Sequence, residues 1–246
     1  MNLRRLESAG SLSVPRVMLG VLKIGASLGR WPGMVDKFAD PLLTAAEASR
    51  HLGIPRSTLQ SWLKDDAPGG SLVHEVPARK RGYPSMPFVA VIEAYVLRSL
   101  RDLGLSKATI RQAALEVREA FDTPYALAAK RIVTDGVDLF IRHSPDQYTR
   151  VGDQQVPIRE VLEDYLRDIS FDKDGFPGRL RLRRYADAAE LIIDPRFAWG
   201  APVVADQKVP IHAVVDLWRA GEPMTVVADE FDLSPATVES ICRVAA

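Results

Sequence analysis

The segment 43–63 constrains the fold of this chain more than any other stretch of its sequence. Thr44 and Glu47 have the spacing of a capping box, in which the two side chains satisfy backbone N–H groups at the start of a helix. Gly53 follows where that helix must end, because glycine takes the left-handed conformation of a helix end at little cost. Apolar residues then recur at helical spacing, which predicts a second helix with one apolar face: Leu59, Trp62 and Leu63. The segment therefore predicts a helix-turn-helix.

The polar face of the second helix carries side chains that suit the major groove of DNA. Arginine can hydrogen-bond to guanine, glutamine to adenine, and lysine to a phosphate. An ordinary helical hairpin with a solvated polar face is the alternative interpretation. We favour DNA binding, with contacts from Arg56, Ser57, Gln60, Ser61 and Lys64.

Residues 72–83 are long enough for a small two-stranded wing that carries three consecutive basic residues in or near its tip. Such a cluster contacts phosphates without reading the base sequence. An apolar helix is expected over 88–103, and another helix with Ser106 as its N-cap follows. We expect backbone phosphates to be contacted by Arg79, Lys80 and Arg81.

This order of elements resembles the DNA-binding domain of MerR-type regulators over about residues 42–120. Besides the helix-turn-helix, the matching motifs are Arg-Gly-Tyr at 81–83 and the segment 100–106. Full MerR regulators continue into a long helix that pairs two subunits, whereas Thr-Pro at 123–124 stops the helix here. Metal-sensing members carry several effector cysteines, and this chain has only Cys242. A metal-responsive activator is therefore not expected.

The region 123–190 has a mixed character. Strands are expected over 137–142 and 147–151, and a helix over 157–169. Residues 179–183 alternate strictly between arginine and leucine, which predicts a strand with its leucines inward. Its arginine row either binds phosphate or an acidic partner, or is a solvated strand face.

A second module is expected over 191–246. Gly221 ends one helix, residues 224–231 form a short helix, and Ser234-Pro235 supply the N-cap and first position of another. The last two helices make a second unit of helix-turn-helix type. Its acidic polar face would repel a phosphate backbone and suits contact with protein; the residues are Asp229, Glu230, Asp232 and Glu239.

The C-terminal module contains four recognisable motifs: Asp-Pro at 194–195, Gly-Ala-Pro-Val-Val at 200–204, Val-Pro-Ile at 209–211 and Ala-Gly-Glu at 220–222. With these motifs it resembles a module of unknown function that is often encoded beside PIN-domain toxins. Residues 205–208 depart from the Gly-Thr/Ser-Arg/Lys that is usual in the module's turn. Together the two modules resemble a VapB-type antitoxin of this two-domain architecture.

The resemblance implies a partner, a PIN-domain VapC ribonuclease that is held inactive, and a complex that represses its own operon on double-stranded operator DNA. A homodimer or a toxin-bridged oligomer is expected. Arginines inserted among the metal-binding carboxylates of such a nuclease could neutralise them. The expected toxin contacts are Arg183, Arg184, Trp218, Arg219 and Arg243. The alternative is a stand-alone MerR-like regulator whose C-terminal module binds a ligand or a second copy.

The sequence lacks the features that are typical of membrane proteins, nucleotide-binding proteins and metalloenzymes. The 32 basic and 32 acidic side chains cancel, so no overall field commits the chain to a membrane or to nucleic acid. Arg16 and Lys23 interrupt the apolar segment 14–29, which is too short to span a membrane. With one cysteine and no P-loop, GxGxxG or HExxH motif, we expect a reducing cytoplasm, no catalytic residue, no cofactor and no metal site. His51 is expected to be a polar surface residue of the first helix.

The predicted fold is mostly α with small β elements. It consists of a basic arm or extension over 1–40, a winged helix-turn-helix over 41–122, a mixed α/β connecting region over 123–190 and a helical module with a helix-turn-helix-like unit over 191–246.

Overall fold

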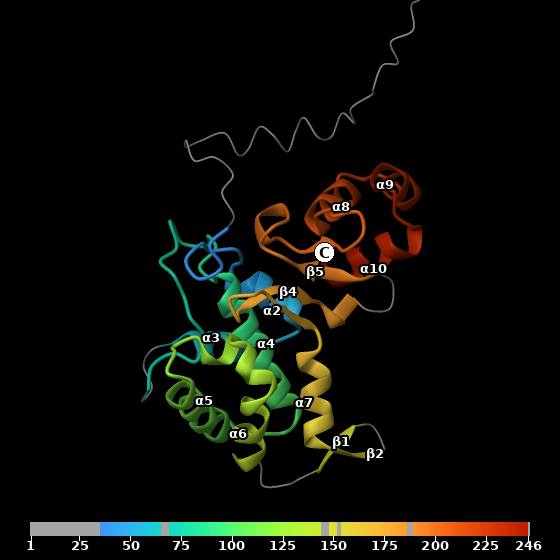
Figure 1. The fold of residues 1–246 in the computed structure, drawn as a ribbon. Helices are drawn as coiled ribbons and strands as arrows, with labels where there is room; N and C mark the ends of the chain where they lie inside the picture. The colour runs from blue at the N-terminus through green and yellow to red at the C-terminus, as the bar shows by residue number, and fades with distance from the viewer. Residues whose placement is uncertain (1–34, 65–68, 144–147, 152–153, 186–188, 246) are drawn as a thin grey trace, which may run out of the picture. The chain divides into compact units, whose positions relative to one another are not determined.

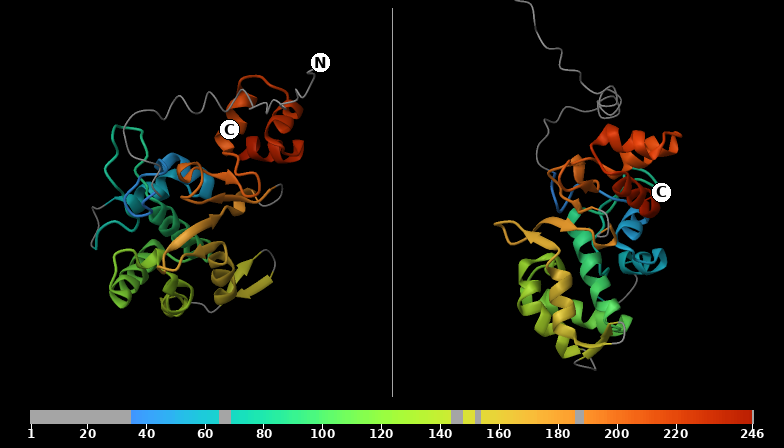
Figure 2. Two further views of the ribbon diagram at one scale, coloured as in Figure 1. Left: turned by 45° about the horizontal axis from the view of Figure 1, so that its top comes forward. Right: turned by 90° about the vertical axis from the view of Figure 1, so that its right-hand side faces the viewer.

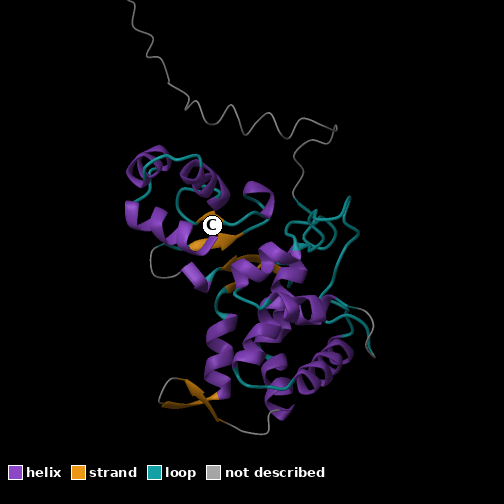
Figure 3. Cartoon of the chain, turned by 180° about the vertical axis from the view of Figure 1, so that it is seen from behind, coloured by secondary structure: helices purple, strands orange, loops and turns teal. Residues whose placement is uncertain are grey.

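The computed structural model confirms the expected fold class, because helices dominate and the strands form small antiparallel sheets (Figures 1 and 3). The N-terminal arm, up to residue 34, lies outside the described residues. None of the helices in the described part of the chain is long and apolar enough to cross a membrane. The structure describes residues 35–64, 69–143, 148–151, 154–185 and 189–245.

The expected helix-turn-helix is formed by α2 (Ala45–Leu52) and α3 (Arg56–Leu63). The Thr44 hydroxyl accepts the backbone N–H of Glu47 at 3.1 Å, and the Glu47 carboxylate accepts the N–H of Thr44 at 2.8 Å. Gly53 has a φ of 64° and ends α2 in the left-handed conformation. These contacts confirm the predicted capping box and helix end, both of which depend on signals that are local in sequence.

The next two helices, α4 (Phe88–Asp102) and α5 (Lys107–Phe121), also have nearly the expected bounds. Almost every residue of α4 is buried, because α5, the middle region and the sheet all pack against it. The Ser106 hydroxyl accepts the N–H of Thr109 at 3.1 Å and caps α5. The helix ends at Phe121, as the Thr-Pro pair after it predicts. Short 3-10 turns follow as η1 (Ala126–Ala128) and η2 (Lys130–Val133).

The strand expected over 137–142 is wrong, because these residues belong to α6 (Asp135–His143). Val137 and Phe140, three residues apart, are both buried where α6 packs against α5. A six-residue segment with four apolar residues does not distinguish a strand from a helix until its packing is known. The next expected strand is present as β1 (Tyr148–Val151), which pairs with β2 (Gln154–Pro157) ahead of α7 (Ile158–Leu166).

A four-stranded antiparallel sheet has the order β3-β4-β5-β6. The strand expected over 179–183 lies in β4 but ends at Arg181, and Arg183 begins the 3-10 turn η3. Leu180 of β4 pairs with Ile193 of β5, so the sheet joins the expected middle region to the C-terminal module. The strands and turn are β3 (Ile169–Phe171), β4 (Pro177–Arg181), β5 (Leu191–Ile193), β6 (Val203–Val204) and η3 (Arg183–Tyr185).

The C-terminal module has the expected helices, which follow the 3-10 turn η4 (Ala198–Gly200). They pack on one another as a group (Figure 2), and α10 also packs against α2 and η3. The helices are α8 (Ile211–Arg219), α9 (Met224–Phe231) and α10 (Pro235–Ala245).

Candidate nucleic-acid interface

The outward face of α3 carries the side chains expected to contact DNA. Trp62, 3% exposed, and Leu59, fully buried, hold the opposite face of the helix in the core. Ser61 is half-buried, and its hydroxyl donates to the carbonyl of Thr58 at 2.7 Å. The exposed members of the expected set are Arg56, Ser57, Gln60 and Lys64. The structure therefore places a polar, cationic face on the second helix of the motif.

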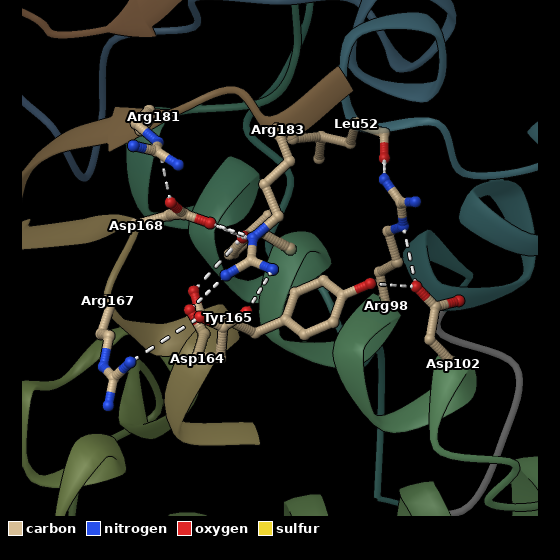
Figure 4. Close-up of polar contacts among 10 residues, drawn as sticks. Leu52, Arg98, Asp102, Asp164, Tyr165, Arg167, Asp168, Arg181 and Arg183 are labelled. Atoms are coloured by element: carbon tan, nitrogen blue, oxygen red, sulfur yellow. Dashed lines mark hydrogen bonds and ion pairs between the residues drawn. The ribbon is translucent and has the colours of Figure 1, made fainter. Parts of the chain in front are cut away.

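Hydrogen bonds from α4 and the turn hold this face in place. A guanidinium N–H of Arg98 on α4 donates to the carbonyl of Leu52 at the end of α2 (Figure 4). Within the turn, the Ser49 hydroxyl donates to the carbonyl of Ile54 at 2.5 Å. The end of α2 and the turn that leads into α3 are thus fixed, which preorganises the face of α3 for a ligand.

The expected two-stranded wing is a loop. The N–H of Val76 donates to the carbonyl of Ser85 at 2.8 Å, but residues 76–85 form no strand. Pro77 and Pro84 lack the N–H groups that a ladder at these positions would need. The loop nevertheless presents the expected basic cluster to solvent, with all three members exposed: Arg79, Lys80 and Arg81.

Charged side chains of α4 and α5 hydrogen-bond to the base of this loop. The Glu93 carboxylate on α4, with no exposed surface, accepts the backbone N–H of His74 at 2.8 Å and bonds its Nδ1 at 2.7 Å. Arg118 on α5 donates to the carbonyls of Ser71 and Leu72 at 2.9 and 3.0 Å. These long-range contacts position the basic cluster, and the spacing of residues in the sequence gave no signal for them.

The residues expected to contact a toxin fall into two environments. Arg183 lies over the ring of Tyr165, 4.4 Å from its centroid, and pairs with Asp164 at 2.7 Å and with the buried Asp168 (Figure 4). Asp168 also accepts the Tyr95 hydroxyl at 2.7 Å; burial and this carboxylate raise the pKa of Tyr95. Arg183 is therefore held by the fold.

The other expected toxin contacts reach solvent. Arg184 is exposed and donates to the carbonyl of Arg50 at 2.7 Å. Trp218 of α8 is half-buried, whereas Arg219 and Arg243 are exposed. The helices that carry these last residues, α8 and α10, pack against each other.

His51 is not on the surface, contrary to expectation. It is 7% exposed, and its Nδ1 lies 2.9 Å from the hydroxyl of Tyr185, a residue of η3 far along the chain. Burial lowers the pKa of His51 to about 4, with Arg50 and Arg184 lowering it further and Glu47 opposing them. Sequence spacing could not reveal this pair, because its partner comes from another part of the fold.

Trp199 is a surface feature that sequence analysis did not identify. The residue is 71% exposed, and its φ of 56° is left-handed. Ala198 before it is also left-handed, with a φ of 45°. A large aromatic side chain in such a conformation is unusual, and left-handed non-glycine residues gather at functional sites.

The fold and its cationic helix face define a helix-turn-helix protein. Residues 41–114 match the family described as "Putative DNA-binding HTH domain", and residues 192–243 match "Protein of unknown function (DUF433)". The chain is 33% identical over 220 residues to "Putative antitoxin VapB45" of Mycobacterium tuberculosis (strain ATCC 25618 / H37Rv), covering 81% of this chain and 91% of the relative. This chain belongs to the VapB antitoxin family.

A solved structure supports the same assignment. The X-ray crystal structure of Rv2018 from Mycobacterium tuberculosis is similar to this chain with a TM-score of 0.67 and 32% identity. The similarity covers 84% of this chain and 99% of the solved one. Among the described residues, no group of three or more His, Cys, Asp and Glu side chains is arranged to hold a metal ion.

Proposed function

We propose that this chain neutralises a cognate PIN-domain VapC ribonuclease in the cytoplasm and binds operator DNA to repress its own operon. The observation that carries the DNA-binding half is the exposed cationic face of α3 in a member of an antitoxin family. A hydrogen bond from α4 holds the end of α2, just before the turn that leads into α3. A homodimer, or an oligomer bridged by the toxin, would present two such faces to an inverted repeat.

Operator binding is tested with duplex DNA from upstream of the chain's own gene. The double variant Arg56→Ala, Gln60→Ala should bind at least tenfold more weakly, since each base contact is worth roughly 1–3 kcal/mol. Arg142→Ala removes an exposed arginine from α6 and is the matched control. Equal affinities of the double variant and the unaltered chain would contradict a DNA-reading role for α3.

Toxin binding is tested by pull-down of the tagged chain from its native cell. A PIN-domain ribonuclease recovered in near-stoichiometric amount, and inactive until released, is the expected result. Recovery of the chain alone, from cells that express the neighbouring gene, would favour the stand-alone regulator.

The inhibitory surface is proposed to include the exposed arginines of η3, α8 and α10. Guanidinium groups placed among the metal-binding carboxylates of the nuclease would neutralise them. The triple variant is Arg184→Ala, Arg219→Ala, Arg243→Ala, because replacing Arg183 would disturb its internal ion pairs. Loss of inhibition with the fold retained is expected. Full inhibition by the triple variant would refute the arginine mechanism, and the control is Arg131→Ala, Arg142→Ala, Arg167→Ala, on other exposed arginines.

A further inference from the structure

An arginine-lined cavity lies beside the helix-turn-helix. Its volume is about 570 Å³, and its walls come from the α2–α3 turn, α4, α7 and η3. Figure 4 shows two of its arginines, Arg98 and Arg183, on either side of Tyr165. The arginines around the cavity are Arg50, Arg56, Arg98, Arg183 and Arg184. We call this the arginine pocket.

The positive charge of the arginine pocket is only partly balanced. Arg98 pairs with Asp102 at 3.3 Å, and Arg183 pairs with two aspartates of the middle region. No carboxylate within the described ranges forms an ion pair with Arg50, Arg56 or Arg184. Three arginines of the cavity wall thus have no ion-pair partner among the described residues.

Two of these guanidinium groups are held in place by the fold. Arg184 donates to the carbonyl of Arg50 at 2.7 Å, and Arg50 donates to the carbonyl of Ala245 at 2.9 Å. Fixed arginines lose little conformational freedom when a ligand binds, which favours recognition of a multi-oxygen anion.

The start of α3 adds to the positive potential of the arginine pocket. Pro55, its N-cap residue, lines the cavity and supplies no side-chain hydrogen bond to the helix. The first N–H groups of a helix have no intrahelical acceptor and carry partial positive charge. Arg56, the first residue of α3, thus belongs both to the cavity wall and to the face proposed to enter DNA.

We propose that the arginine pocket is a phosphate-binding site. Guanidinium groups bind phosphate through paired, charge-assisted hydrogen bonds, and a phosphate offers enough acceptor oxygens for several of them. Because Arg56 is shared with the DNA-facing side of α3, the preferred source is a backbone phosphate of the bound DNA strand. This assignment of the source rests on the proposed function. The other source of the same chemistry is a free phosphorylated compound.

The experiment measures how salt changes the affinity of the full chain for a duplex. A lost phosphate contact reduces the slope of log K against log [salt] by about 0.9. Arg184→Gln removes the charge and keeps a polar side chain with an amide N–H. We expect the reduced slope for Arg184→Gln. Arg184→Lys, which keeps the charge, and the control Arg142→Ala should both have the slope of the unaltered chain.

A second measurement separates the sources and does not depend on DNA binding. The melting temperature of each variant is recorded with inorganic pyrophosphate and with sodium chloride at equal ionic strength. A reduced slope for Arg184→Gln assigns the phosphate to DNA. An unchanged slope, with stabilisation by pyrophosphate in the unaltered chain but not in Arg184→Gln, assigns it to a free compound. If the salt slope and the stabilisation by pyrophosphate are both the same in the unaltered chain and in Arg184→Gln, the proposal of a phosphate site is overturned.

The two measurements also distinguish failure of the proposed function from failure of the pocket. If the unaltered chain binds neither its upstream DNA nor any other duplex, the DNA-binding half of the proposed function fails. The pyrophosphate comparison then decides the pocket by itself.

Discussion

Acid should destabilise this protein through His51. The pKa of the buried imidazole is about 4 in the folded chain, against 6.5 in the unfolded chain, so the unfolded state takes up a proton first as the pH falls. The contribution of His51 to stability is fully present above pH 6.5 and is lost progressively between pH 6.5 and pH 4. Lowering the pH from about 7.5 to about 5 should therefore cost about 2 kcal/mol of unfolding free energy through this group alone.

The assay is urea unfolding at both pH values, for the unaltered chain and for His51→Gln. Glutamine cannot take up a proton in this range, and it keeps a polar side chain of similar size beside the Tyr185 hydroxyl that His51 contacts. Carboxylates elsewhere titrate alike in both proteins, so the difference between their pH dependences isolates the histidine. Equal losses of stability in the two proteins would refute the reasoning, since a solvated imidazole would give no such difference.

Three further predictions concern single contacts of the fold, each read from the midpoint of urea unfolding. Asp168→Ala removes the buried carboxylate that pairs with two arginines and should lower the free energy of unfolding by about 3 kcal/mol. The exposed Asp164→Ala should lower it by less than about 1 kcal/mol, and equal losses would contradict the role of burial. Thr44→Ala removes the cap of α2 and should cost about 1 kcal/mol, whereas Thr44→Ser should cost little. Gly200→Ala should destabilise by about 1–3 kcal/mol, because φ is 78° and an added Cβ would overlap Leu42; a neutral result would show that this turn adapts.

The helix-turn-helix was predictable because its determinants are close in sequence. Thr44 and Glu47 are three residues apart, and Gly53 ends the helix that they begin. The same holds for Ser106 at the start of α5. Signals of this kind act within one helical turn, so a single sequence contains them in full.

The errors arose where distant residues decide the outcome. The run from Val137 became a helix because its buried residues meet α5, and His51 became buried because Tyr185 covers it. The arginine pocket could not be anticipated either. Arg56 and Arg184 lie far apart in sequence, and only the packing of η3 against α2 places them around one cavity.

At Trp199, the left-handed backbone conformation favours glycine, whereas the exposed surface carries an indole. A non-glycine residue pays about 1 kcal/mol for this conformation, and glycine does not. Because the indole is mostly outside the core, Trp199→Gly would leave the packing of the module nearly intact while relieving the backbone. A library selected for heat resistance alone would thus enrich glycine at this position. A library selected for a function that requires the exposed indole would keep tryptophan.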